Sequence, residues 1–277
     1  MQDQYPDRPN FVTHDIRPIH RLSLIAALGM ACLSLAGLFF QFKIYPTAEL
    51  RRSFVPNDVV NLLLGLLVLL GSMRLARHGR LIGLLLWPGA LFYITYNYIA
   101  CAAAAAFSLT FVFYTTLVVL TVYTIVRLLP SIDSAAVRQR LAGAVPDRLA
   151  GGVLILFSML FLLRAAGQLA GSIAGRTDLA GTAFAVLISD LLTMPCWLAG
   201  GVLLWRRQAV GTIAAAGLLF QASMLFIGLL FFFILQPLLT ASPFPGGDFA
   251  VVFAMALVCF VPFGLFVRGV LLSEARA

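Results

Sequence analysis

The chain alternates eight times between apolar runs of about 20 residues and short polar connections. Runs of this length can cross a hydrocarbon layer of roughly 30 Å as α-helices. Membrane strands would instead give alternating segments of about 10 residues, which the sequence does not show. The pattern predicts an all-α, polytopic bundle of eight transmembrane helices, over residues 21–42, 58–73, 81–103, 106–129, 149–172, 180–205, 209–238 and 249–271.

Basic residues mark alternate connections between these runs. Fourteen of the 19 Lys and Arg residues fall on one side of the expected membrane, four fall on the other, and Arg164 lies inside a run. Because Lys- and Arg-rich loops stay in the cytoplasm, we expect a multi-pass protein of the cytoplasmic membrane with both termini inside. The expected segments are a tail (1–20), a four-helix half (21–129), a cytoplasmic linker (130–148), a second four-helix half (149–271) and a tail (272–277).

The linker is the longest cytoplasmic connection. Its sequence predicts a short helix along the membrane surface that begins at Ser131 or Asp133, since both residue types cap helix starts.

Composition excludes several classes of protein. With 61% hydrophobic and 11% charged residues, the chain is too apolar for a soluble domain. The net charge of +8 comes from residues at the ends of apolar runs rather than from a basic stripe, so no nucleic-acid partner is expected. The cysteines lie in apolar runs without CxxC spacing and the histidines lie outside them, so we expect neither a metal nor another cofactor.

Enzyme signatures are missing from the sequence. It contains neither HExxH nor GxSxG, and its single lysine, Lys43, does not belong to a P-loop. An enzyme is therefore the less favoured class, although a lipid-acting enzyme of unfamiliar type stays open.

The two halves share landmarks that predict an internal duplication. Because each half would contain an even number of helices, the repeats would be parallel, related by an axis along the membrane normal. Asp190 would then occupy the place of Asp58, which we expect to cap a short second span. The matched pairs are Arg21 and Arg148, Gln41 and Gln168, Asp58 and Asp190, Arg74 and Arg206, and Gly79 and Gly211.

Four polar residues lie at one depth in different apolar runs. Asp190, Arg164, Asn97 and Gln221 are each 14 to 17 residues from the nearest cytoplasmic arginine. At 1.5 Å per residue they lie roughly 21–26 Å from the cytoplasmic boundary, in the outer third of the membrane. Because an unpaired charge in lipid is costly, we predict that Arg164 and Asp190 form an ion pair.

This polar layer has two interpretations: structural contacts that fix helix register, or the lining of a cavity that binds a polar ligand or a proton. Intramembrane tyrosines such as Tyr96 could shape a pocket, but an interfacial belt or packing explains most of them more simply. The candidate site residues are Asp190, Arg164, Gln168, Gln221, Asn97, Tyr93, Asp58 and Asn61.

Three functions follow as hypotheses. The favoured one is a small transporter or ligand-binding permease for a small polar or lipid-derived ligand, with lipid as its only other expected partner. The alternatives are a non-catalytic scaffold with a dry core, and the lipid-acting enzyme; the oligomeric state stays open. The segments LLLWPGALFY (84–93) and LLFQASMLFIGL (218–229) resemble parts of uncharacterised multi-span membrane proteins from prokaryotes, which implies no activity and no functional residue.

Overall fold

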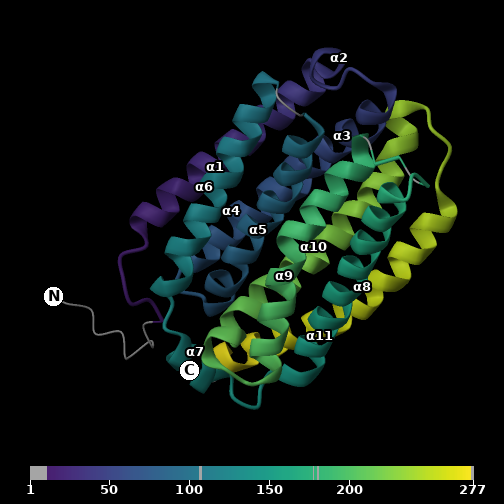
Figure 1. Cartoon of the computed structure of the whole chain (residues 1–277). Coiled ribbons are helices and arrows are strands. Elements are labelled where there is room, and N and C mark those ends of the chain that lie inside the picture. The colour runs from purple at the N-terminus through teal and green to yellow at the C-terminus, as the bar shows by residue number, and fades with distance from the viewer. Residues whose placement is uncertain (1–10, 106–107, 177, 180, 276–277) are drawn as a thin grey trace.

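The computed structural model describes residues 11–105, 108–176, 178–179 and 181–275, and within these ranges the chain is a bundle of long helices (Figure 1). Eight helical segments are long and apolar enough to cross a membrane, which confirms the predicted number and class. They are α1 (Arg17–Phe39), α3 (Ala48–Val60) continuing through a π-helical turn (Asn61–Gly65) into α4 (Leu66–Arg77), α5 (Leu81–Ala104), α6 (Leu109–Leu128), α8 (Asp147–Ile173), α9 (Gly181–Trp205), α10 (Ala209–Thr240) and α11 (Gly246–Ala275).

The connections lie at two opposite ends of the bundle. We call the end that holds the connections 78–80, 129–146 and 206–208 the arginine-rich end, and the end that holds 40–47, 174–176 and 241–245 the arginine-poor end. The short helix α2 (Gln41–Ile44) lies at the arginine-poor end and α7 (Ser134–Leu141) at the arginine-rich end.

The second span is longer than predicted and begins ten residues earlier. Thr47 caps α3, its hydroxyl accepting a hydrogen bond from the Leu50 amide at 3.2 Å. The expectation that Asp58 caps this span is therefore wrong: Asp58 lies inside α3, and Pro56 is accommodated within the same helix. The polar residues at 48–53 resembled a loop in sequence, but they form the first turns of the helix at the end of the bundle.

The short helix predicted in the linker is present, and it begins at the second of the two predicted caps. Asp133 caps α7 by accepting a hydrogen bond from the Ala136 amide at 2.9 Å. Arg138 of α7 forms an ion pair with Asp147 at the start of α8, at 2.9 Å. This ion pair connects α7 to the second half of the chain.

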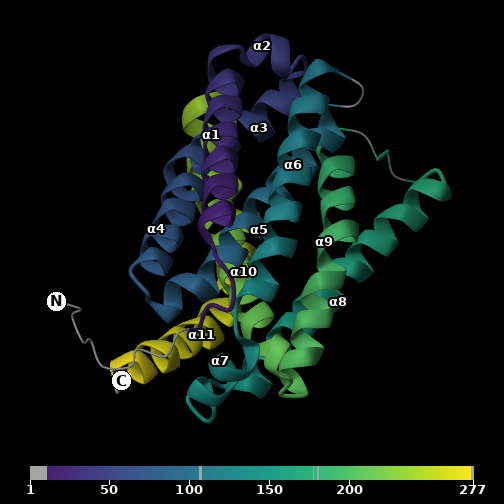
Figure 2. The ribbon, with the colours of Figure 1, turned by 90° about the vertical axis from the view of Figure 1, so that its left-hand side faces the viewer.

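Helices α5 and α10 form the centre of the bundle. They meet at glycines: a Cβ added to Gly89 would clash with the carbonyl oxygen of Gly217. The surrounding contacts come in matching pairs, since α9 packs on α5 as α3 packs on α10, and α8 contacts α11 as α1 contacts α6. Figure 2 shows α1 between α4 and α6, on the far side of α5 from α8 and α9.

The turns before α5 and α10 are built alike, which sets the register between the halves. Gly79 (φ 71°) and Arg207 (φ 56°) both take the left-handed conformation that ends a helix. The Arg80 amide donates to Leu75 as the Gln208 amide donates to Leu203. The sequence landmarks match Gly79 with Gly211. The two turns instead make Arg207 the counterpart of Gly79.

This register also corrects the proposed match between the two aspartates. With Gly79 aligned to Arg207, residue counting places Asp58 at Val186, about one helical turn from Asp190. The π-helical turn Asn61–Gly65 lies within this count and has no counterpart in α9. The sequence does not indicate this match, because the left-handed position after Arg206 is occupied by Arg207 and not by a glycine.

Candidate functional site

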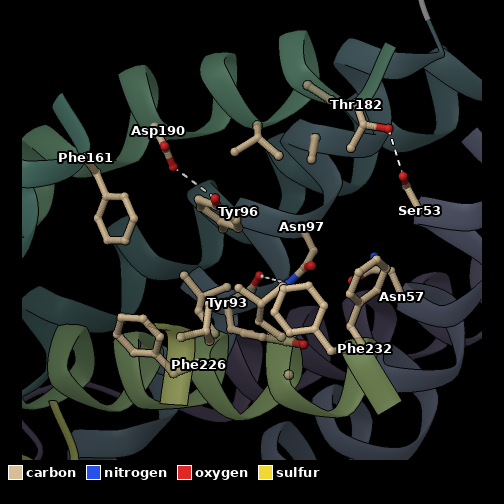
Figure 3. Close-up of a pocket in the computed structure, with 18 of the residues that line it drawn as sticks. Ser53, Asn57, Tyr93, Tyr96, Asn97, Phe161, Thr182, Asp190, Phe226 and Phe232 are labelled. Atoms are coloured by element: carbon tan, nitrogen blue, oxygen red, sulfur yellow. Dashed lines mark hydrogen bonds between the residues drawn. The ribbon is translucent and has the colours of Figure 1, made fainter. Parts of the chain in front are cut away.

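A half-open cavity of about 600 Å³ lies between the two halves, lined by residues of α3, α5, α8, α9, α10 and α11. Figure 3 shows part of its lining. Most of its wall is apolar, and aromatic rings are prominent in it. It extends toward the arginine-poor end, where Thr182 and Asp248 line it from the first turns of α9 and α11. Its aromatic lining consists of Phe54, Tyr93, Tyr96, Phe161, Trp197, Phe226, Phe232 and Phe233.

The predicted ion pair lies in this wall. Arg164 Nη2 donates to Asp190 Oδ2 at 2.5 Å, which confirms the pairing of α8 with α9 at matched depth. The Tyr96 hydroxyl donates to the other carboxylate oxygen at 2.9 Å. Both oxygens of Asp190 are therefore satisfied, and its negative charge is balanced.

The two partners differ in their surroundings. The Asp190 side chain is 2% exposed, whereas the Arg164 side chain is 40% exposed. Arg164 lines the cavity beside the Phe161 ring, whose centroid lies 5.9 Å from the guanidinium carbon. The guanidinium is thus the member of the pair that a bound molecule could reach.

A second polar group lines the cavity from α5 and α3. Asn97 Nδ2 donates to the Tyr93 carbonyl at 2.9 Å, so these residues share one face of α5. Asn57 of α3 lines the cavity near Asn97 (Figure 3). The polar side chains are thus few and lie on separate helices around an apolar space.

Hydrogen bonds join the two halves near the arginine-poor end of the cavity. The Thr182 amide, at the start of α9, donates to Glu49 Oε1 at 2.9 Å. The Thr182 hydroxyl donates to Ser53 Oγ at 2.9 Å, and both residues line the cavity. Residues Glu49 and Ser53 belong to α3, so this contact fixes α3 against α9.

The remaining candidates lie outside the cavity lining. Gln221 is fully buried and accepts a hydrogen bond from Trp197 Nε1 at 2.5 Å, so it acts in the packing of α10 against α9. Gln168 lies one turn beyond Arg164 and is half-buried. Asp58 and Asn61 are buried on α3 and the π-helical turn, away from the lining.

Sequence reasoning left out several lining residues. Tyr96 is 16 residues from Arg80, the same count that places Asp190 relative to Arg206, so depth alone could have included it in the polar layer. An interfacial belt or packing is the simpler explanation of an intramembrane tyrosine in sequence, and Tyr96 is an exception to it. The sequence does not indicate the other polar lining residues, because they lie where a loop or a helix start is expected: Ser53, Asn57 and Thr182.

The described residues contain no cluster of three or more His, Cys, Asp or Glu side chains that would hold a metal ion. No family model, no curated protein and no solved structure matches the chain.

Proposed function

We propose that this multi-pass membrane protein binds a small amphipathic molecule in the cavity and carries it as a small transporter or permease. The observation that carries the proposal is the cavity itself. Ligand sites are mostly apolar hollows of about 300–1,000 Å³ with a few placed polar groups, and this cavity fits that description.

The walls indicate the chemistry of the ligand. Its apolar part would contact the phenyl rings of α8 and α10, including Phe161 and Phe226. Its polar part would hydrogen-bond to Arg164, Asn97 or Asn57. Because Asp190 already neutralises Arg164, the part of the cavity around this pair favours a neutral hydrogen-bonding head over one with a net charge.

The location between the halves supports a transporter over a scaffold. Transporters built from parallel repeats hold their substrates at the interface of the repeats. A scaffold would need no such space, and we expected its core to be packed. No observation favours the lipid-acting enzyme. The proposal keeps the cytoplasmic membrane as location and the arginine-rich end as the cytoplasmic side.

Three probes with the same apolar chain test the proposal: octyl glucoside, octanoate and octylamine. Thermal unfolding of the protein in nanodiscs should shift upward most with octyl glucoside. Val186→Trp, which fills the cavity, should lose the shift, whereas Leu192→Trp on the 60% exposed face of the same helix should keep it. Equal shifts for both variants would mean that the probes act through the membrane alone.

A further inference from the structure

A second polar cluster lies within the first half, separate from the cavity lining. It surrounds Asp58, a residue that is 3% exposed and lies inside the second span, nearer its arginine-poor end. Tyr45, at the arginine-poor end before α3, donates its hydroxyl to Asp58 Oδ2 at 2.8 Å. Helix α1 packs closely here, since a Cβ added to Gly37 would clash with the same oxygen.

The cluster provides no positive charge for this carboxyl group. None of the ion pairs among the described residues involves Asp58. Among the described residues, the side chains grouped around Asp58 carry hydroxyl and thiol groups: Ser34 from α1, Tyr45, Tyr98 and Cys101 from α5, and Tyr114 from α6. The nearby cation, Arg51, donates instead to the Tyr45 carbonyl at 2.9 Å. Asp190, by contrast, has Arg164. A permanently ionised carboxylate without a counter-ion would be costly at this depth.

The hydroxyl groups form connected hydrogen bonds. Ser34 Oγ and the Tyr98 hydroxyl are 3.1 Å apart, and Tyr98 donates to the Met30 carbonyl at 3.1 Å. Burial raises the pKa of Tyr45 far above its usual range, so this tyrosine keeps its proton and stays a donor. Tyr45 lies in the connection that ends at Thr47, which places the cluster next to the arginine-poor end.

We propose that Asp58 is a reversible proton-binding site and that its protonation is linked to occupation of the cavity. The carboxylate takes one proton from water at the arginine-poor end and becomes a neutral carboxylic acid. It returns the same proton to water when it ionises again. The linkage rests on the proposed function, whereas the proton site itself does not.

The linkage has a structural basis in two shared helices. Asn57 lines the cavity and its neighbour Asp58 faces the cluster; likewise Asn97 lines the cavity and its neighbour Tyr98 belongs to the cluster. A movement of α3 or α5 that accommodates a ligand must therefore shift the groups around Asp58.

The chain next to Asp58 is suited to such a movement. The π-helical turn Asn61–Gly65 begins three residues later, and π-helical turns occur frequently at functional sites. The Asn61 side chain is fully buried, and neither its amide nitrogen nor its oxygen has a hydrogen-bond partner in the described part of the chain. A shift of this turn would let Asn61 gain a partner.

Infrared spectroscopy of the full chain in nanodiscs tests the proton site directly. We expect one carbonyl band of a protonated carboxyl group to disappear as the pH rises, and to be missing from Asp58→Asn at every pH. Tyr45→Phe should move the midpoint to higher pH, because the ionised form loses its donor. Tyr123→Phe, on the 49% exposed face of α6, is the matched control and should leave the midpoint unchanged.

A band that never titrates, or a spectrum that Asp58→Asn does not alter, would overturn the proton site. If Asp58→Asn does not fold, the Tyr45→Phe shift decides the question. For the linkage, Val186→Trp should move the midpoint by about half a pH unit, roughly threefold in proton affinity, and Leu192→Trp should not. A titrating band with an unmoved midpoint in Val186→Trp would refute the linkage alone. Failure of the octyl glucoside test with a titrating band would refute the proposed ligand site, and the linkage with it, but not the proton site.

Discussion

The ion pair between Arg164 and Asp190 gives an asymmetric prediction for mutagenesis. In Arg164→Gln the Asp190 carboxylate, with its side chain 2% exposed, keeps only its hydrogen bond from Tyr96. In Asp190→Asn the freed guanidinium is already 40% exposed and can hydrogen-bond to water in the cavity. Loss of the arginine should therefore destabilise the protein more than loss of the aspartate.

The expected magnitudes follow from this exposure. Breaking a fully buried pair costs about 3–5 kcal/mol. Because the arginine is partly exposed, we expect about 2–3 kcal/mol for Arg164→Gln and about 1 kcal/mol for Asp190→Asn. The double variant has no unpaired charge and should be more stable than Arg164→Gln alone. The coupling energy of the cycle should be about 1–2 kcal/mol.

Reversible unfolding in mixed detergent micelles, for wild type and the three variants, measures this cycle. The control is the cycle of Arg80 and Glu274, a pair at 2.7 Å at the arginine-rich end whose arginine side chain is 50% exposed. Its coupling energy should be below about 1 kcal/mol. The reasoning is refuted if both cycles give the same coupling energy, or if Asp190→Asn destabilises the protein more than Arg164→Gln.

Other features give further predictions. Gly89→Ala should lower the free energy of unfolding by about 2–4 kcal/mol, because the added Cβ meets the Gly217 carbonyl. Gly71→Ala, with nothing within 4 Å of the added Cβ, should change that free energy little in the same unfolding assay. Asp133→Ala should destabilise α7 by about 1 kcal/mol, seen as faster amide exchange confined to that helix, and unchanged exchange would contradict its role as the cap. A reporter fused to the C-terminus should be active only in the cytoplasm, and a cysteine at Ser242 should react only from outside; the reverse pattern would invert the proposed topology.

The sequence was a sufficient guide to the features that depend on composition and depth. The eight apolar runs can be identified as membrane spans because each has the length needed to cross a membrane. The pairing of Arg164 with Asp190 could be found by counting, because antiparallel neighbours at equal distance from a common turn lie side by side. The depth of these two residues along their helices follows from counting residues from the ends of the spans.

The direction in which each side chain points was less accessible. Gln221 and Asn97 lie at similar depth, but Gln221 packs against Trp197 while Asn97 faces the cavity. That difference depends on how the helices rotate, which the close contact of Gly89 with Gly217 fixes. Asp58 was misplaced because polar residues before it resembled a loop, although they form helical turns beyond the apolar part of the span.

The central claim is that a water-accessible cavity lies between the two halves. The most direct test is the labelling of a single cysteine at Val186, in a chain whose four cysteines have been replaced, by a charged, membrane-impermeant thiol reagent added outside intact cells. The cavity predicts that Val186→Cys reacts, whereas Leu192→Cys, on the lipid-facing side of the same helix, does not. If neither cysteine reacts, the space between the halves is closed to water and the claim is contradicted.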